Sequence, residues 1–186
     1  FVEVYNRGDK PVDLSDWRLN GDIQYSFRSE TTIQPGEAIV VAAASFRNRA
    51  MFRDFFKLES DTQLLGQIRS DLPDLTGTVR LEQPLALPPE ASGPNSRLIV
   101  DEVTYDSTPP WPSPIQGNSF ARTQGDAYGQ VPTSWKEDSP TPGTVHFEAG
   151  LPGDFTNDNM VDAKDIDMLF REVAGGTDRS DFDLNQ

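Results

Sequence analysis

Short runs of alternating apolar and polar residues recur along residues 1–145. In TVRLEQ, at residues 78–83, Val79 and Leu81 alternate with charged neighbours, and FVEVY at residues 1–5 has the same period of two. Such alternation is typical of strands with one face in a core and the other toward solvent. Seven segments are therefore predicted to be strands, at residues 1–5, 14–19, 23–27, 38–43, 78–83, 97–105 and 119–123.

Turn-forming sequences separate these strands. The intervening segments NRGDKP, QPGE, PPEASGPNS and STPPWPSPIQGNS are rich in Gly, Pro, Asn and Ser, the residues that mark turns and loops. Seven short strands with frequent turns predict a mainly β fold, specifically an antiparallel β-sandwich.

One segment within this region is helical in pattern. In SFRNRAMFRDFF, at residues 45–56, we expect Phe46, Met51 and Phe55 to cover an edge of the sandwich. The longest apolar run, AIVVAAA at residues 38–44, is far shorter than the roughly 18 residues of a membrane-spanning helix. It indicates a buried strand, and no membrane insertion is expected.

The chain divides where Pro and Gly interrupt the strand pattern, in SPTPGTVHFEAGLPG at residues 139–153. We predict a β-sandwich at residues 1–142, a linker at 143–152 and a separate C-terminal segment at 153–186. From Ile166 onward, apolar residues of this segment follow the spacing of an amphipathic helix, which Gly175 and Gly176 would end. The segment therefore has the order of a loop, a helix and a stop.

The loop before this helix, GDFTNDNMVDAKD, has the oxygen spacing of an EF-hand calcium loop. Such a loop binds calcium through positions 1, 3, 5, 7, 9 and 12, with the backbone carbonyl at position 7 and often a water at position 9. A cation would also relieve the repulsion among four carboxylates held within twelve residues. The predicted calcium ligands are Asp154, Thr156, Asp158, the Met160 carbonyl, Asp162 and Asp165.

Two positions depart from the EF-hand pattern. Thr156 is a neutral ligand, and Asn159 stands at position 6, where the EF-hand has Gly. Asn tolerates the left-handed backbone better than other residues with a side chain, so the sharp turn remains possible. The alternative is a metal-free helix cap, in which Asp162 is the N-cap and Asp165 an acidic residue of the first turn. Capping accounts for two of the four aspartates.

Composition narrows the classes of function. The 186 residues carry a formal net charge of -14, and residues 153–186 hold nine acidic and three basic residues. Nucleic acid and anionic lipid require clustered Lys and Arg, so nucleic-acid binding is not expected. The chain has no cysteine, which excludes disulfides, zinc-thiolate sites and thiol nucleophiles and fits a secreted bacterial protein. Because the chain begins at Phe1 rather than Met, we expect a fragment or a processed product.

Residues 1–145 resemble the bacterial lamin tail domain. The E-x-Y-N turn of that family corresponds to Glu3, Tyr5 and Asn6, and its V-D-L-S-x-W motif to Val12–Ser15 and Trp17. The segments QPGEAIVVA, RLIVDEVTYD and WKEDSPTPGTV resemble its later strands and its closing P-T-P-G. The resemblance implies an immunoglobulin-like sandwich at the surface of, or outside, a bacterial cell. It also implies one further strand before the E-x-Y-N turn, which the chain lacks.

The C-terminal segment resembles a type I dockerin repeat, a calcium loop and helix in which position 12 is commonly Asp. Dockerins use two such repeats to bind a protein partner. A second loop resembling the first begins with Asp183 and Asn185 and stops at Gln186, so this possible second site is incomplete.

Three other features could indicate a specific binding or catalytic function, and they also have a purely structural explanation. Arg7, Gly8 and Asp9 spell a tripeptide that some adhesion receptors recognise, although a turn between strands also needs Gly and Asp. Trp111 lies in a Pro-rich loop, where an aromatic ring could stack on a sugar or close an open sandwich edge. The lone histidine, His146, lies in the predicted linker, which leaves no histidine-based triad in the sandwich.

Two classes of function remain from the sequence. The first is a noncatalytic extracellular interaction module, with the β-sandwich and a calcium-stabilised tail attaching to a protein partner or to neighbouring domains. The second is a carbohydrate-binding accessory domain of a larger extracellular enzyme. No independent enzymatic activity is expected, because neither a phosphate-binding loop nor a zinc motif is present.

Overall fold

A computed structural model divides the chain into two compact units, Phe1–Phe147 and Glu148–Gln186. It describes residues 1–42, 46, 48–68, 71–85, 96–113, 117–147, 163–164, 166–167 and 170. The first unit extends past Pro142, so residues 143–147 of the predicted linker belong to it. Across the described residues, no helix combines the length and the apolar character that crossing a bilayer requires.

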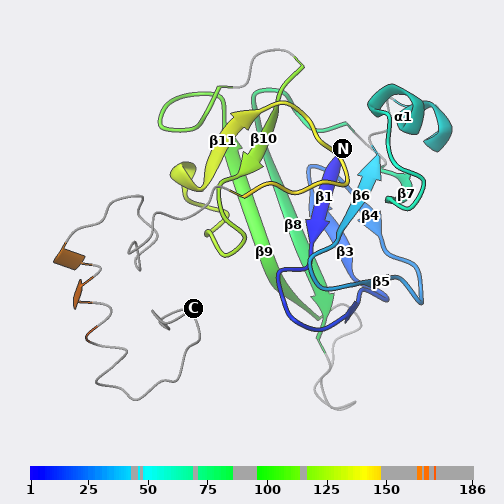
Figure 1. Ribbon diagram of the computed structural model, residues 1–186, viewed down its shortest axis with the longest axis horizontal. Helices are drawn as coiled ribbons and strands as arrows, with labels where there is room; N and C mark the ends of the chain where they lie inside the picture. The colour runs from blue at the N-terminus through cyan, green and yellow to red at the C-terminus, as the bar shows by residue number, and fades with distance from the viewer. Residues whose placement is uncertain are drawn as a thin grey trace. The chain divides into compact units, whose positions relative to one another are not determined.

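The first unit is mainly β, as the alternating pattern predicts (Figure 1). Each of the seven predicted segments overlaps a strand, and four further strands were not predicted, at residues 12–13, 32–33, 63–67 and 135–138. The strands are β1 (Val2–Tyr5), β2 (Val12–Asp13), β3 (Arg18–Gly21), β4 (Tyr25–Ser26), β5 (Thr32–Ile33), β6 (Ala38–Ala42), β7 (Gln63–Gln67), β8 (Thr76–Pro84), β9 (Arg97–Asp106), β10 (Ser119–Arg122) and β11 (Trp135–Asp138). The helices are α1 (Arg49–Phe56) and the short 3-10 helix η1 (Pro132–Ser134).

The two longest strands, β8 and β9, belong to a four-stranded antiparallel sheet in the order β4-β3-β8-β9. Leu19 of β3 pairs with Leu81 of β8, and both contribute to the core. Because side chains alternate across a strand, the residues on either side of them point to the opposite, outer face. A bulge in β9 shifts the pairing with β8 between Leu81 and Glu82.

A second sheet has the order β1-β6-β7. Strand β1 pairs antiparallel with β6, whereas β6 and β7 are parallel. The expectation of an entirely antiparallel fold was therefore wrong at this pair. Parallel neighbours need a crossover connection, and the chain between Ala42 and Gln63 supplies one that contains α1.

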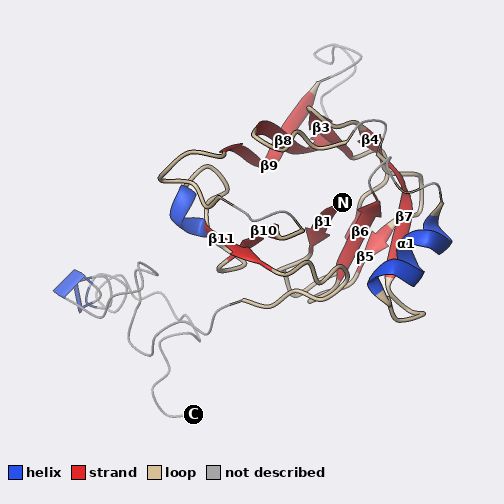
Figure 2. Ribbon diagram, turned by 90° about the horizontal axis from the view of Figure 1, so that it is seen from above, coloured by secondary structure: helices blue, strands red, loops and turns tan. Residues whose placement is uncertain are grey.

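The core lies between two layers (Figure 2). The four-stranded sheet forms one side, and β1, β6 and the β10-β11 hairpin lie across from it. This arrangement agrees with an immunoglobulin-like sandwich. Trp17 packs against the core. The buried residues of this cluster are Val4, Leu14, Leu19, Ile23, Phe27, Ile33, Ile39, Val41 and Ile68.

Helix α1 begins at an N-cap, Asn48, whose side chain accepts a hydrogen bond from the Met51 backbone. Its buried residue is Phe52, which is 0% exposed and packs edge-on against Phe1. Met51 and Phe55 are instead 48% and 69% exposed. The prediction that these two residues cover the sandwich edge was therefore wrong, because the helix turns its Phe52 face inward.

Candidate functional site

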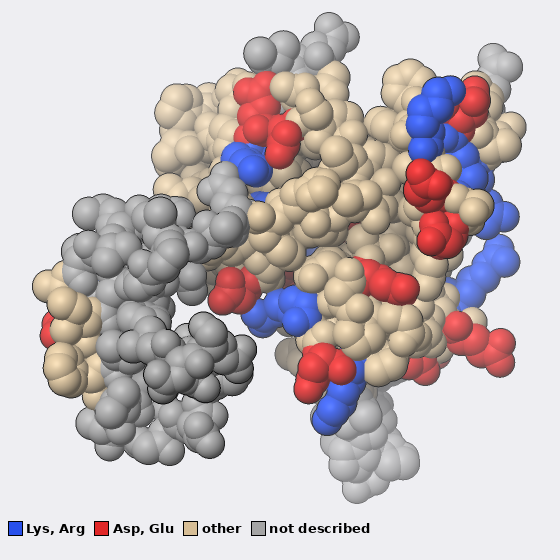
Figure 3. Space-filling model, viewed as in Figure 1, with Lys and Arg blue, Asp and Glu red and all other residues tan. Residues whose placement is uncertain are grey.

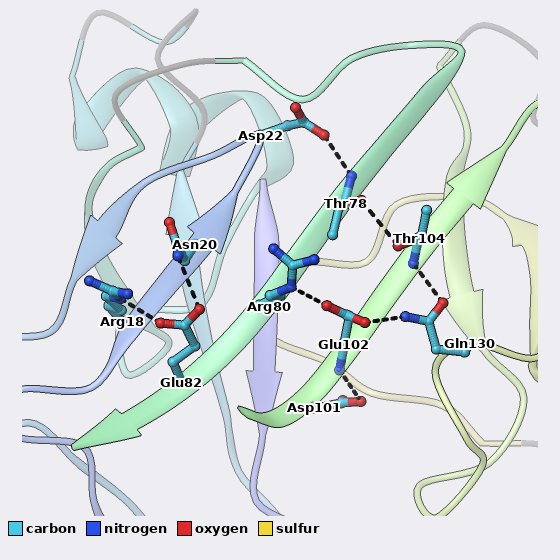
Figure 4. Close-up of polar contacts among 10 residues, drawn as sticks. All are labelled: Arg18, Asn20, Asp22, Thr78, Arg80, Glu82, Asp101, Glu102, Thr104 and Gln130. Atoms are coloured by element: carbon cyan, nitrogen blue, oxygen red, sulfur yellow. Dashed lines mark hydrogen bonds and ion pairs between the residues drawn. The ribbon is translucent and has the colours of Figure 1, made fainter. Parts of the chain in front are cut away.

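The outer face of the four-stranded sheet carries a network of polar side chains (Figure 4). Glu82 of β8 accepts hydrogen bonds from Arg18 Nε at 2.6 Å and from Asn20 Nδ2 at 3.0 Å. Burial by itself would raise the pKa of Glu82, but the hydrogen bonds from Asn20 and Arg18 and the nearby positive charges hold it below its usual value. Glu82 is therefore a paired, ionised carboxylate.

A second set of contacts crosses from β8 to β9 (Figure 4). Arg80 forms an ion pair with Glu102, which also accepts a hydrogen bond from Gln130 Nε2 at 2.5 Å. The side-chain oxygen of Gln130 accepts a hydrogen bond from the Thr104 backbone N–H at 3.3 Å. Gln130 thus covers part of the β9 edge, and the charges of this face neutralise one another.

Arg122 joins the β9 edge to the β10-β11 hairpin. Its guanidinium lies 2.7 Å from Asp101, donates to the Ala127 carbonyl and stacks 4.9 Å from the centre of the Trp135 ring. Gly129 lies close enough to the Glu102 carbonyl that any side chain there would overlap it. These contacts hold the loop before η1 against the sheet, so Arg122 is a structural residue.

Glu3 has the most altered carboxyl of the described residues. Burial raises the pKa of Glu3 to about 7, against the opposing effect of a hydrogen bond from the Gly143 backbone. A carboxyl with such a pKa could act as a general base. The 2.6 Å bond from Gly143 N to Glu3 Oε1 already occupies this group, however. Glu3 therefore connects two segments of the fold.

The tripeptide Arg7–Asp9, Trp111 and His146 lie in three separate parts of the first unit. Arg7, Gly8 and Asp9 are exposed in the loop after β1, where Gly8 N donates to the Asn6 side chain. Trp111 is half-buried and packs edge-on against Phe120 at 6.4 Å. That packing fits closure of a sandwich edge. His146 is exposed near the end of the first unit.

The α1 region presents a different surface, which sequence reasoning missed. Met51 and Phe55 project from the helix, and Arg49 at its start is exposed, as is Arg28 in the loop after β4. Burial raises the pKa of Tyr25, and the positive charges of Arg28 and Arg49 oppose that shift. The signal in the sequence was the basic and aromatic run at residues 46–57.

The predicted calcium ligands lie outside the described residues. This applies to all six positions of the first loop and to Asp183 and Asn185 of the incomplete second one. Among the residues that the structure does describe, no group of His, Cys, Asp and Glu is arranged to hold a metal ion. Within the second unit, Ala163, Lys164, Ile166, Asp167 and Phe170 are helical and exposed.

Comparison with known proteins finds a similarity for the first part of the chain. Residues 1–82 match the family model of the lamin tail domain. This lamin tail match includes strands β1–β7 and most of β8, and it contains both motifs on which the resemblance was first seen, at Glu3–Asn6 and Val12–Trp17. Searches of curated proteins and of solved structures gave no significant match. The match shows that residues 1–82 are similar to the lamin tail domain, which agrees with the immunoglobulin-like arrangement of the strands.

Proposed function

We propose that the protein is a noncatalytic extracellular module that attaches to a protein partner. The observation that carries this proposal is the lamin tail match over residues 1–82. The ionisable groups of the sandwich support it. The carboxylates of Glu82 and Glu102 are paired with arginines, and the buried carboxyl of Glu3 is bound to a backbone N–H. These groups stabilise the fold rather than serving as an acid or base.

A binding selection with the whole protein tests this function. We expect a display library of random peptides to yield ligands that bind saturably, and that keep binding when the first unit alone is presented. Turnover of glycosides or esters by the purified protein, with no saturable peptide ligand, would show that the noncatalytic assignment is wrong.

We further propose that the C-terminal segment binds one calcium ion as a dockerin-like loop and helix. The ligands are those that the spacing assigns: Asp154, Thr156, Asp158, the Met160 carbonyl, Asp162 and Asp165. The helical state of Ala163, Lys164, Ile166 and Asp167 agrees with a helix that begins in the last positions of this loop and continues beyond it. Asp183 and Asn185 would begin a second loop of the same kind.

The proposed setting is a secreted or surface protein of a bacterium. Calcium sites of moderate affinity are filled where calcium is abundant, as it is outside cells, and the chain has no cysteine that oxidation could alter. The alternative of carbohydrate binding depends on Trp111, whose ring packs against Phe120. No contact in the described residues favours it.

A further inference from the structure

Strand β9 lies at the edge of the four-stranded sheet and carries exposed aliphatic side chains there. Among the described strands, β9 pairs only with β8, and Figure 2 shows it at one end of that layer. Leu98, Ile99 and Val100 follow one another in β9 and are 47%, 51% and 47% exposed. Exposed aliphatic residues on an open edge are the feature through which one strand recruits another.

The C-terminal half of the same edge is already covered. The Thr104 N–H donates to the Gln130 side chain, and Gly129 packs against the Glu102 carbonyl. Within the described residues, no loop or side chain forms a hydrogen bond with the outer backbone of residues 97–100 in this way. We define residues 97–101 as the open β9 edge. Its free N–H and C=O groups are those that a further strand would pair with.

The open β9 edge has charges of opposite sign at its two ends, Arg97 and Asp101. Arg97 donates to the Asp16 carbonyl, but among the described residues it has no ion-pair partner. Asp101 pairs with Arg122, and its side chain remains partly exposed. The order along the edge is therefore a base, three aliphatic residues and an acid. Such an order is complementary to itself when two copies run in opposite directions.

We propose that two copies of this protein pair through the open β9 edge, as antiparallel strands related by a two-fold axis at Ile99. In this register Leu98 lies opposite Val100 of the other copy, and Arg97 lies opposite Asp101 of the other copy. The aliphatic side chains then cover one another, and the two four-stranded sheets form one continuous sheet. This inference is independent of the partner protein proposed above.

The bulge in β9 keeps this complementarity. It falls at Val100, the residue left out of the pairing with β8. If the bulge persists across the new pair of strands, the residue opposite Arg97 shifts from Asp101 to Glu102. Both residues are acidic, so Arg97 faces a carboxylate in either alignment.

A second copy fits this edge even though the chain carries a net charge of -14. The open β9 edge is itself neutral, and part of the negative charge lies in residues 153–186, with nine acidic and three basic residues. Figure 3 shows acidic and basic side chains interspersed over one face of the first unit. Screening over about 8–10 Å at physiological salt limits the repulsion between more distant acids of the two copies.

Sedimentation equilibrium of the whole protein at physiological salt tests the proposal. We expect a monomer–dimer equilibrium with a dissociation constant on the order of 10–100 μM, because the interface is small. Ile99→Lys places two like charges at the axis and should raise this constant at least about tenfold. Arg97→Glu should do the same, whereas Arg97→Lys should stay within about threefold of the parent. The matched control is Leu75→Lys, since Leu75 is 68% exposed just before β8 and should leave the constant unchanged.

A disulfide tests the register directly, because the chain has no cysteine of its own. Residues directly opposite one another in an antiparallel pair have Cα atoms about 4.5–5.5 Å apart, which a disulfide can bridge. Ile99→Cys should therefore form a covalent dimer at least about tenfold faster than Leu75→Cys with the same oxidant.

Several results would overturn the proposal. A parent protein that stays monomeric up to about 1 mM does not self-associate through this edge. A dimer that Ile99→Lys weakens no more than Leu75→Lys does, or equal cross-linking of the two Cys variants, places the contact elsewhere. If the protein is monomeric and an extended aliphatic peptide binds the parent but not Ile99→Lys, the edge serves another protein and self-pairing is wrong. Should Ile99→Lys lose the circular dichroism of the parent, Arg97→Glu and Ile99→Cys decide the matter.

Discussion

Gly143 donates its backbone N–H to the side chain of Glu3 at 2.6 Å, across 140 positions of the chain. Glu3 lies within the residues that match the lamin tail domain, whereas Gly143 lies well beyond them. Nearby, Phe147 packs edge-on against Tyr5 at 5.2 Å. The last loop of the first unit is thereby fixed to its first strand.

Glu3→Gln should remove a pH dependence of stability. Burial raises the folded pKa of Glu3 from its ordinary 4.5 to about 7, so the folded state holds the proton more tightly. Relative to Glu3→Gln, the parent protein should have its greatest stability below pH 4.5 and lose about 3 kcal/mol of it as pH rises to 7. Denaturant unfolding at a series of pH values measures the difference. Parallel curves for the two proteins would mean that Glu3 is not desolvated.

The extent of the first unit can be tested with two fragments. Residues 1–147 should melt cooperatively in excess chelator with a β-type circular dichroism spectrum, because the strands of this unit form their own core and no group of His, Asp and Glu among its described residues is arranged to hold a metal ion. Residues 1–142 should also fold but melt at a lower temperature, since they lack the Gly143 hydrogen bond and the Phe147 ring. Equal melting temperatures would contradict a stabilising role for residues 143–147.

Gly143→Ala should destabilise the protein more than Gly36→Ala. Both glycines have positive φ, of 88° and 72°, so each substitution costs about 1 kcal/mol of backbone strain. A Cβ at Gly143 would also overlap the Thr62 side chain, whereas the space at Gly36 is open. We therefore expect a loss of about 3 kcal/mol at Gly143. Thermal unfolding compares the two, and equal losses would show that Thr62 moves aside without cost.

Alternation located the long strands because each has one face in the core, as Leu19 and Leu81 have. It missed β2 and β5, which have two residues each and show no period. It also missed β11, where WKED reads as a charged loop until β10 pairs with it. The orientation of α1 was not decidable from sequence, because aromatic residues lie on both of its sides and contact with Phe1 selects Phe52.

The polar contacts on the outer face of the four-stranded sheet could not be predicted from the sequence. Arg18 and Glu82 meet only because of the pairing register between β3 and β8, at a separation of 64 positions. No local pattern specifies that register. Local spacing predicts a complete ligand set in the proposed calcium loop, since all of its oxygens would come from one short segment.

Glu82→Ala should destabilise the sandwich by about 2 kcal/mol. The change removes the largely buried carboxylate that accepts the hydrogen bonds of Arg18 and Asn20, and it leaves both donors without an acceptor. The matched control is Asp54→Ala, which removes the exposed ion pair with Lys57. That change should leave the unfolding midpoint where it is, since exposed ion pairs contribute little. Similar midpoints for both variants would mean that the Glu82 network does not stabilise the fold.

Calcium binding by the C-terminal segment is expected to depend on Asp165. In an EF-hand type of loop the residue at position 12 binds with both carboxylate oxygens, so Asp165→Ala should abolish measurable binding. Asp167→Ala is the matched control, because Asp167 lies on the following helix outside the loop and is exposed. Thr156→Asn should bind as well as the parent or better, since Asn offers a longer-reaching oxygen. Magnesium should bind less well because it demands tight octahedral geometry and sheds water reluctantly. Isothermal titration separates the two explanations of the acidic segment: if Asp165→Ala binds calcium as tightly as Asp167→Ala does, the aspartates only cap a helix.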